Sequence, residues 1–249
     1  MNAIGLDCGS SWCKGAWLDK NLNARELISR PAGWNLKKAI EEVLETLREL
    51  TGPGAIVAAT GYGRGLVAGA KLRPTEIGCH AKGAEFLASG TRSVIDIGGQ
   101  DTKAIGALNG KVLTFQMNDR CAAGTGRFLE KSLERLSLNL EDIDLITGVS
   151  PASVASLCAV FAESEIMSLL FQGVSRESIA LGVVEALAEK AASLLSKIKP
   201  LSPVALTGGL CQCRTLAKTL SKASGVQVIN LERGRHAGAI GAALLALSA

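Results

Sequence analysis

The sequence contains one short pattern twice: an apolar strand, an Asp-x-Gly turn and a second strand. Residues 4–9 (Ile-Gly-Leu-Asp-Cys-Gly) match residues 94–99 (Val-Ile-Asp-Ile-Gly-Gly). When the two copies are aligned, three pairs coincide: Asp7 with Asp96, Gly9 with Gly98, and Lys14 with Lys103. A single Asp-x-Gly is typical of an ordinary hairpin turn, but two copies in matched context favour an internal duplication. Two duplicated halves whose turns face one another predict a ligand cleft between lobes.

Strand and helix patterns alternate along the chain, which predicts a layered α/β protein. We expect strands at 2–7, 14–18, 24–29, 55–59, 93–97, 102–107, 111–116, 204–206 and 226–229. Helical spacing of apolar residues predicts helices at 36–50, 122–136, 161–171 and 177–199, a helix between the last two strands, and a final one near the C-terminus. The expected division is an N-terminal lobe at 1–90 and a C-terminal lobe at 91–249, with the last helix packing back on the first lobe.

The turns at Asp7 and Asp96 have the chemistry of a metal–phosphate site. Glycine permits positive φ and lets backbone N–H groups approach phosphate oxygens, while a carboxylate at the strand end holds Mg²⁺, usually through water. A third glycine turn, Thr207-Gly208-Gly209, follows the next apolar strand. Beside two phosphate turns, it is a candidate platform for adenine or ribose rather than only a tight turn into a helix.

Composition excludes several classes of function. The net charge of +4 is modest and forms no long basic run, so nucleic-acid binding is not expected. The sequence has no run of about 18 uncharged apolar residues, so we do not expect a membrane span. The apolar opening is interrupted at once by Asp7 and Lys14, unlike a signal peptide, so we expect a cytoplasmic protein. Seven cysteines, an odd number in a reducing compartment, then indicate thiols or metal ligands rather than disulfides.

Three motifs resemble those of a known superfamily: Asp7-Cys8-Gly9-Ser10-Ser11, Asp96-Ile97-Gly98-Gly99-Gln100-Asp101 and Thr207-Gly208-Gly209. They are similar to the two phosphate motifs and the adenosine motif of the acetate-and-sugar-kinase/Hsp70/actin superfamily. More narrowly, nearly the whole chain resembles the activator components of 2-hydroxyacyl-CoA dehydratases, which are related to ATPase subunits of benzoyl-CoA reductase. The sharpest stretches are 96–101, 116–128 and 158–165. The resemblance implies a duplicated actin/Hsp70-like (ribonuclease H-like) ATPase fold, with two lobes around a nucleotide cleft.

The resemblance also implies a homodimer bridged by one [4Fe-4S] cluster, with Cys121 and Cys158 of each subunit as ligands. A cubane cluster takes four thiolates, and a two-fold axis turns two ligands per chain into four. ATP hydrolysis would then drive one-electron transfer to a 2-hydroxyacyl-CoA dehydratase or related partner, with ferredoxin or flavodoxin as electron donor. Without the motif context, two such cysteines would be interpreted as buried structural thiols.

For the nucleotide, the resemblance implies ATP or ADP with Mg²⁺, bound by Asp7, Gly9, Ser10, Ser11, Lys14, Asp96, Gly98, Gly99, Gly208 and Gly209. Gln100 and Asp101 are candidates for placing the attacking water and Mg²⁺. Glu163 is a candidate to face the γ-phosphate, an ordinary solvent-facing helix glutamate being the alternative. Lys14 and Lys103 either pair with phosphate or face solvent from their strands.

Other features have a less specific interpretation. Cys211-Gln212-Cys213 offers two closely spaced thiols, either a metal pair or structural thiols. His80 and His236 lack clustered partners in the sequence, and we expect them to be structural or exposed. The run Thr60-Gly61-Tyr62-Gly63-Arg64 predicts a constrained loop. Two other classes of function remain open: a small-molecule kinase of the same fold, and an actin-type scaffolding protein, both without iron.

Overall fold

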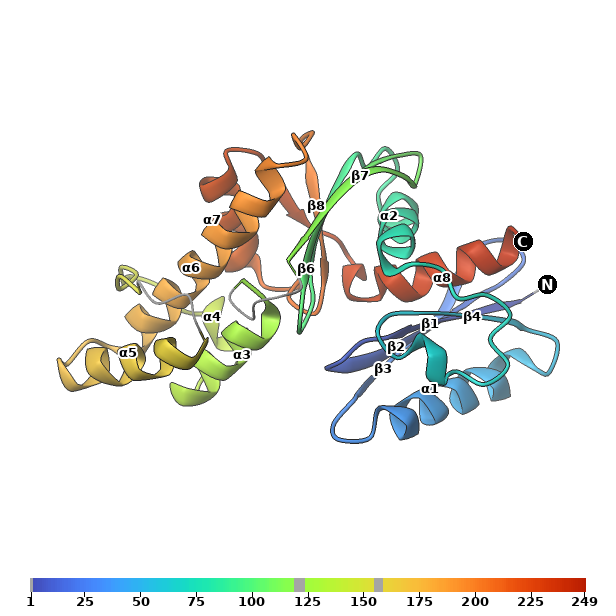
Figure 1. The fold of residues 1–249 in the computed structure, drawn as a ribbon, viewed down its shortest axis with the longest axis horizontal. Coiled ribbons are helices and arrows are strands. Elements are labelled where there is room, and N and C mark those ends of the chain that lie inside the picture. The colour runs from blue at the N-terminus through green and yellow to red at the C-terminus, as the bar shows by residue number, and fades with distance from the viewer. Residues whose placement is uncertain (1, 119–123, 155–158) are drawn as a thin grey trace.

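The computed structural model describes residues 2–118, 124–154 and 159–249. They form two α/β lobes side by side in an elongated molecule, with two helices packed between the sheets (Figure 1). None of the described helices combines the length and the apolar character that crossing a membrane would require.

The first lobe is built on a four-stranded sheet in the order β3-β2-β1-β4. Its elements are β1 (Ala3–Cys8), β2 (Trp12–Leu18), β3 (Ala24–Pro31), α1 (Leu36–Thr51), β4 (Ile56–Thr60) and the short helix η1 (Arg64–Leu66). The apolar face of α1, including Ile40, Val43 and Leu47, packs with Ile4 and Leu6 of the sheet. The helical spacing read from the sequence therefore marks the covered face of this sheet.

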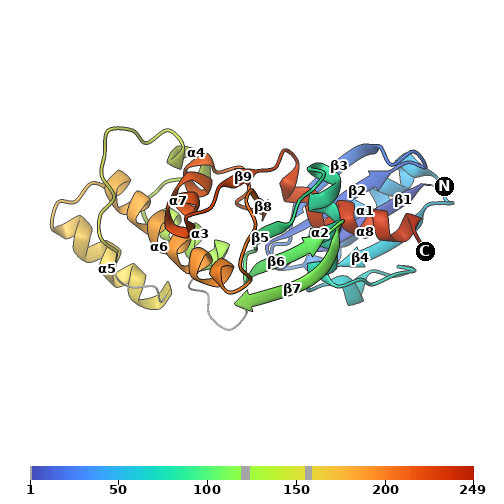
Figure 2. The ribbon, with the colours of Figure 1, turned by 90° about the horizontal axis from the view of Figure 1, so that it is seen from above.

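The second lobe is built on a five-stranded sheet in the order β7-β6-β5-β8-β9. Its strands are β5 (Ser93–Ile97), β6 (Thr102–Leu108), β7 (Lys111–Asn118), β8 (Val204–Gly208) and β9 (Val228–Asn230). Its helices are α3 (Gly126–Arg135), α4 (Leu140–Ile143), α5 (Ala159–Phe171), α6 (Arg176–Ser196) and α7 (Arg214–Ser224). Figure 2 shows these helices gathered at the end of the molecule far from both termini.

The two sheets repeat one register, which confirms the predicted duplication. In the first, Asp7 lies opposite Lys14 on the antiparallel neighbour and opposite Thr60 on the parallel one. In the second, the equivalent residues are Asp96, Lys103 and Thr207.

Two helices fill the space between the sheets: α2 (Glu76–Leu87) and α8 (Ala237–Leu247), the latter preceded by η2 (Gly234–His236). Helix α8 is buried along nearly its whole length and packs on the first sheet and on α2. The two helices approach closely through small residues: a Cβ at Gly83 or Gly241 would collide with backbone of the other helix. The last helix thus returns to the first lobe.

The expected strands and long helices are all present, with two differences. Helix α2 was not predicted, because it is buried on several sides by small residues and lacks a clear apolar stripe. Helix α3 begins at Gly126 rather than Ala122; within the described residues, Gly124 has a φ of +86°, which ends any helical path there.

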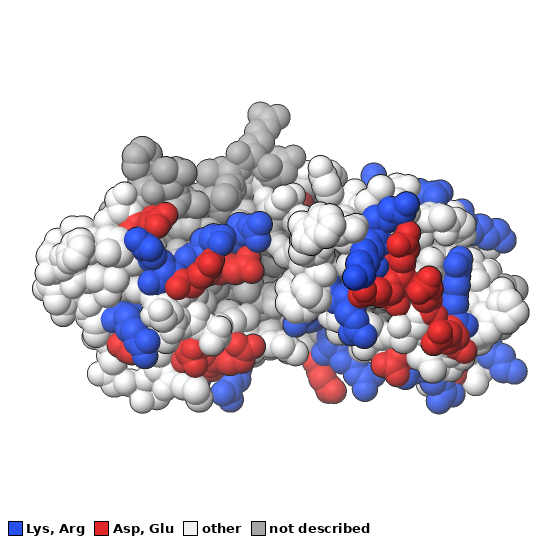
Figure 3. Space-filling model, turned by 90° about the horizontal axis from the view of Figure 1, so that it is seen from below, with Lys and Arg blue, Asp and Glu red and all other residues white. Residues whose placement is uncertain are grey.

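The face shown in Figure 3 interleaves basic and acidic side chains over both lobes instead of gathering one sign. Two helices carry ion pairs one helical turn apart. On α1 they are Lys37–Glu41 and Lys38–Glu42, and on α3 they are Arg127–Glu130 and Lys131–Glu134. Such exposed pairs contribute little stability.

Candidate functional site

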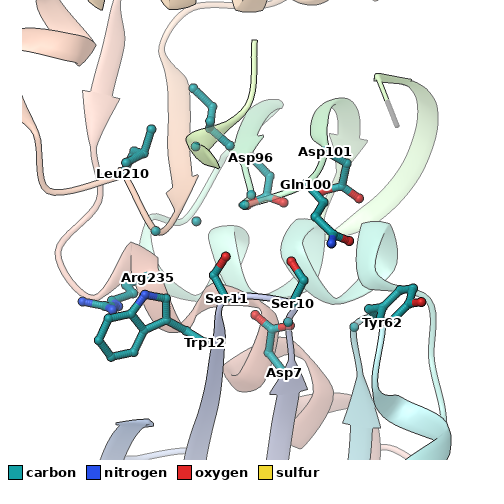
Figure 4. Close-up of a pocket in the computed structure, with 18 of the residues that line it drawn as sticks. Asp7, Ser10, Ser11, Trp12, Tyr62, Asp96, Gln100, Asp101, Leu210 and Arg235 are labelled. Carbon is teal, nitrogen blue, oxygen red and sulfur yellow. The ribbon is translucent and has the colours of Figure 1, made fainter. Parts of the chain in front are cut away.

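A cleft of about 1230 Å³ lies where the strand ends of the two lobes face each other. In Figure 4, Asp7, Ser10 and Ser11 point up from the first lobe, while Asp96, Gln100 and Asp101 point down from the second. A third turn, at Gly208 to Leu210, and residues of α3 and α4 extend the wall of the cleft in the second lobe.

The first turn holds a buried ion pair. The Lys14 ammonium lies 3.1 Å from Oδ2 of Asp7, and both side chains are almost fully buried. Burial disfavours the charge on Lys14, but the Asp7 and Asp96 carboxylates outweigh it and raise the pKa of this lysine. The second oxygen of Asp7, Oδ1, is buried with no hydrogen-bond partner among the described residues. A buried carboxylate oxygen without a partner is unusual, which makes it a candidate acceptor for a bound water or cation.

The second turn has the same pair, enlarged into a network around one ammonium group. Nζ of Lys103 lies 3.3 Å from Asp96, 2.6 Å from Asp101 and 2.9 Å from Glu76. Burial opposes the charge on Lys103, yet the three carboxylates raise its pKa well above the usual range. Lys103 is thus charged, and its ammonium group connects the second phosphate turn to Glu76, the first residue of α2.

His80 of α2 joins this network from the other side. Its Nδ1 lies 3.0 Å from Oγ1 of Thr207 and 3.4 Å from Oδ1 of Asp96, and Thr207 itself donates to Asp96. Burial would raise the pKa of Asp96, but His80 and Lys103 outweigh it and lower that pKa. Glu76, His80 and Asp96 are close enough together to hold a metal ion. The Lys103 ammonium already contacts both carboxylates, at 2.9 Å from Glu76 and 3.3 Å from Asp96, so we assign no metal to this trio.

In each lobe, a glycine with positive φ lies beside the aspartate of the phosphate turn. Gly61, with φ +87°, follows Thr60, and Gly208, with φ +90°, follows the equivalent Thr207. A Cβ on either would lie 2.9 Å or 2.6 Å, respectively, from Oδ1 of the neighbouring aspartate. The run Thr60-Gly61 is therefore the counterpart in the first lobe of Thr207-Gly208, a relation that the sequence analysis missed.

The second phosphate turn is also tied to helix α3. The backbone N–H groups of Gly126 and Arg127 donate to the carbonyls of Gly98 and Gly99, at 2.8 and 3.1 Å. Thr102 donates through its hydroxyl to the carbonyl of Gly124 at 2.6 Å. The residues that bound a phosphate would touch are thus bonded directly to the start of this helix.

Comparison with known proteins decides the family. The BadF/BadG/BcrA/BcrD ATPase family matches residues 4–246. The chain belongs to this ATPase family. The resemblance and the ATPase fold expected from the motifs are thereby confirmed.

Curated relatives of this family ATPase cover almost its full length. It is 42% identical to the uncharacterised protein YjiL of Escherichia coli K12, over 98% of this chain and 96% of that one. It is 37% identical to the (R)-2-hydroxyglutaryl-CoA dehydratase activating ATPase of Acidaminococcus fermentans, with the same coverages. The activator of the 2-hydroxyisocaproyl-CoA dehydratase from Clostridium difficile, solved with bound ADPNP, superposes with a TM-score of 0.92 at 34% identity, covering 100% of this chain and 95% of that one.

The structure brings most of the predicted site residues of the family ATPase into one cleft. Those lining it are Asp7, Gly9, Ser10, Ser11, Lys14, Asp96, Gly98, Gly99, Gln100, Asp101, Gly208 and Gly209. Cys121 and Cys158 lie outside the described residues. Glu163 is placed elsewhere: it lies on α5, its side chain is 62% exposed, and it pairs with Arg135 at 3.5 Å.

For Lys14 and Lys103 the structure excludes one of the two alternatives that the sequence left open. Neither lysine faces solvent, because each is paired with aspartate below the strand ends. His80 has partners contributed by β5 and β8, which sequence distance concealed. Glu76 was missed altogether. Its signal was the helix start Pro74-Thr75-Glu76, in which the Thr75 side chain caps α2.

The five described cysteines are buried free thiols. Cys8 and Cys13 face each other across β1 and β2 within the core beneath α1. Burial raises the pKa of Cys211 and of Cys213 to about 11, which keeps both thiols protonated. The Cys213 sulfur caps α7 by accepting from the Leu216 N–H, so this thiol has a structural role.

Proposed function

We propose that this family ATPase binds Mg²⁺-ATP in the cleft and uses its hydrolysis to drive one-electron transfer to a 2-hydroxyacyl-CoA dehydratase or related enzyme. The observation that carries the proposal is the pair of equivalent Asp–Lys turns facing each other across the cleft in a chain of this family. Named relatives that match nearly the whole chain are dehydratase activators, which supports this choice of partner.

The cleft floor suits a polyphosphate only together with a divalent cation. Four carboxylates and two ammonium groups meet there: Asp7, Glu76, Asp96 and Asp101 with Lys14 and Lys103. Unaccompanied phosphates would be repelled by this excess of negative charge. Mg²⁺ binds through one or two carboxylates plus phosphate oxygens and waters, and the unpartnered Oδ1 of Asp7 is free for one such water.

For hydrolysis we propose that Gln100 and Asp101 place the attacking water and Mg²⁺ at the terminal phosphate. Glu76 takes the role of the glutamate facing the γ-phosphate, which the sequence had given to Glu163. Glu76 lines the cleft, and burial followed by the nearby Asp7 charge raises its pKa. A carboxylate with raised basicity beside the cleft can orient the attacking water and accept its proton. Its bond to Lys103 holds it in place.

For electron transfer we propose that Cys121 and Cys158 of each subunit hold one [4Fe-4S] cluster between two copies of the chain. The cluster would supply the one-electron redox chemistry, with ferredoxin or flavodoxin as electron donor. The chemistry of the other cysteines supports this choice, because the five described ones are buried and separate from any group of potential metal ligands in the described residues. The described residues next to both segments, Gly124 and Val154, pack on α6 at Lys190 and Gly182.

The bonds from Gly98 and Gly99 to the start of α3 supply a route for coupling. Gly124 follows the segment that contains Cys121 and is bonded to Thr102 beside the second phosphate turn. Lobe closure on ATP would pull on this turn and hence on the cysteine segment. A nucleotide shifts such an equilibrium only through different affinities for the two states, which the γ-phosphate can provide.

The test is anaerobic purification with iron and sulfide measured per subunit. Wild type should hold about two iron and two sulfide per chain, and Cys121→Ala and Cys158→Ala should lose them. Cys13→Ala, which removes a buried core thiol, is the matched control and should keep the iron. An iron-free wild type that still hydrolyses ATP would overturn the electron-transfer proposal and favour a small-molecule kinase.

A further inference from the structure

A stacked pair of side chains lies at one end of the cleft and has no role in the proposed function so far. The Arg235 guanidinium lies 4.2 Å from the ring centroid of Trp12. Trp12 begins β2 in the first lobe, while Arg235 belongs to η2, where the chain leaves the second lobe. The pair therefore spans the two lobes, and both residues line the cleft.

Arg235 has donor capacity that no described group uses. Its Nε is buried and has no hydrogen-bond partner, and its guanidinium makes no ion pair among the described residues. Lys14 and Lys103 are instead paired with carboxylates of the site. A buried donor without a partner costs free energy, so a bound water or a ligand is expected to satisfy it, and the place of Arg235 on the cleft wall favours a ligand.

The position of Arg235 shows which part of a nucleotide it would meet. In Figure 4, Trp12, Arg235 and Leu210 lie at one end of the cleft, while Gln100, Asp101 and Tyr62 lie at the other. If Gln100 and Asp101 serve the terminal phosphate, Arg235 lies at the opposite end of the phosphate chain, next to the Gly208–Gly209 turn assigned to the nucleoside.

We propose that Arg235, held against Trp12, binds the α-phosphate of the nucleotide, and so binds ATP and ADP alike. This inference rests on the proposed nucleotide site. Trp12 restricts the guanidinium by a cation–π contact, which leaves its N–H edge for an anion. Because the α-phosphate takes no part in hydrolysis, the interaction is the same before and after the reaction. It therefore contributes affinity rather than turnover.

Affinity measurements on single variants test this assignment. Arg235→Gln should weaken Mg²⁺-ADP and a non-hydrolysable Mg²⁺-ATP analogue by the same factor, about tenfold or more. The kcat at saturating ATP should stay within about twofold. Arg235→Lys should recover part of the affinity, because it keeps the charge without the planar edge. Arg233→Gln removes an exposed arginine two positions away and should change neither constant.

Tryptophan fluorescence gives a readout that is independent of turnover. Trp12 is one of three tryptophans in the chain, and nucleotide binding beside it should change the emission. Trp12→Phe should abolish this change, whereas Trp34→Phe, at a 94% exposed position, should retain it.

Several outcomes would overturn the assignment. Unchanged nucleotide affinities in Arg235→Gln would show that Arg235 does not bind the nucleotide. A loss of affinity confined to the ATP analogue would indicate that Arg235 binds the γ-phosphate instead of the α-phosphate. A lowered melting temperature of the nucleotide-free variant would indicate a structural role instead. If wild type binds no nucleotide by either method, the proposed function itself fails, which is a distinct result.

Discussion

At the scale of single residues, the site depends on charges that are paired below the surface. Lys103 is only 2% exposed, yet it meets three carboxylates, two from the neighbouring 96–101 turn and one from the start of α2. Its ammonium group offsets part of the negative charge on the floor of the cleft and fixes the positions of Glu76 and Asp101 at the same time. The sequence aligned Asp96 and Lys103 with Asp7 and Lys14, but it predicted neither the pairing of each lysine with its aspartate nor the contact with Glu76.

We expect Lys103→Met to destabilise the fold and abolish ATP hydrolysis. The substitution leaves Asp96, Asp101 and Glu76 without their shared cation, and breaking a buried pair in this way costs about 3–5 kcal/mol. Urea unfolding of the nucleotide-free protein measures the loss. The control Lys131→Met removes an exposed lysine paired with Glu134 and should cost less than about 1 kcal/mol. Equal stabilities of the two variants would contradict the role given to Lys103.

At the scale of elements, the strand–turn units decide where ligand groups can lie. Gly61 and Gly208 occupy equivalent places at strand ends, and each has a positive φ with the neighbouring aspartate less than 3 Å from where a Cβ would lie. The backbone N–H of Gly63 donates to the carbonyl of Cys8 at 2.9 Å, so the Gly61 turn is bonded to the first phosphate turn. The run 60–64, interpreted from sequence as a constrained loop, is therefore part of the wall of the site.

Gly61→Ala should reduce both stability and nucleotide affinity. A side chain there is strained by about 1–2 kcal/mol because of the positive φ, and its Cβ would also press on Asp7. Gly225→Ala is the control, since Gly225 is a left-handed glycine with a φ of +71° and nothing within 4 Å of an added Cβ. Thermal melting and ADP titration should show a larger loss for Gly61→Ala. A loss no greater than that of Gly225→Ala would argue against close packing at this turn.

At the scale of the whole molecule, two sheets share α2 and α8 as a common middle layer, and the start of α2 lines the cleft. Any change in the angle between the lobes must pass through this layer, whereas the bonds between the second phosphate turn and α3 lie within the second lobe. Closure around a nucleotide is a known way to reorganise distant segments.

If the proposed cluster is present, its accessibility should depend on the nucleotide. We expect an iron chelator to remove iron several times faster with a non-hydrolysable Mg²⁺-ATP analogue than with Mg²⁺-ADP, because only the former closes the lobes on the γ-phosphate. The absorbance of the iron–chelator complex under anaerobic conditions follows the rate. Identical rates of iron removal with both nucleotides would contradict the proposed coupling between the nucleotide cleft and the cysteine segments.

The sequence by itself determined the features that depend on local order along the chain. Alternating strands and helices, the duplicated Asp-x-Gly turns and the glycines of the third turn could all be predicted, because each depends on neighbouring residues. Tertiary structure alone decided the contacts made across long distances in sequence. It brought His80 to Thr207, Glu76 to Lys103 and Arg235 to Trp12. It also made a helix of the small residues at 76–87, since burial between two sheets removes the apolar stripe by which a surface helix is recognised.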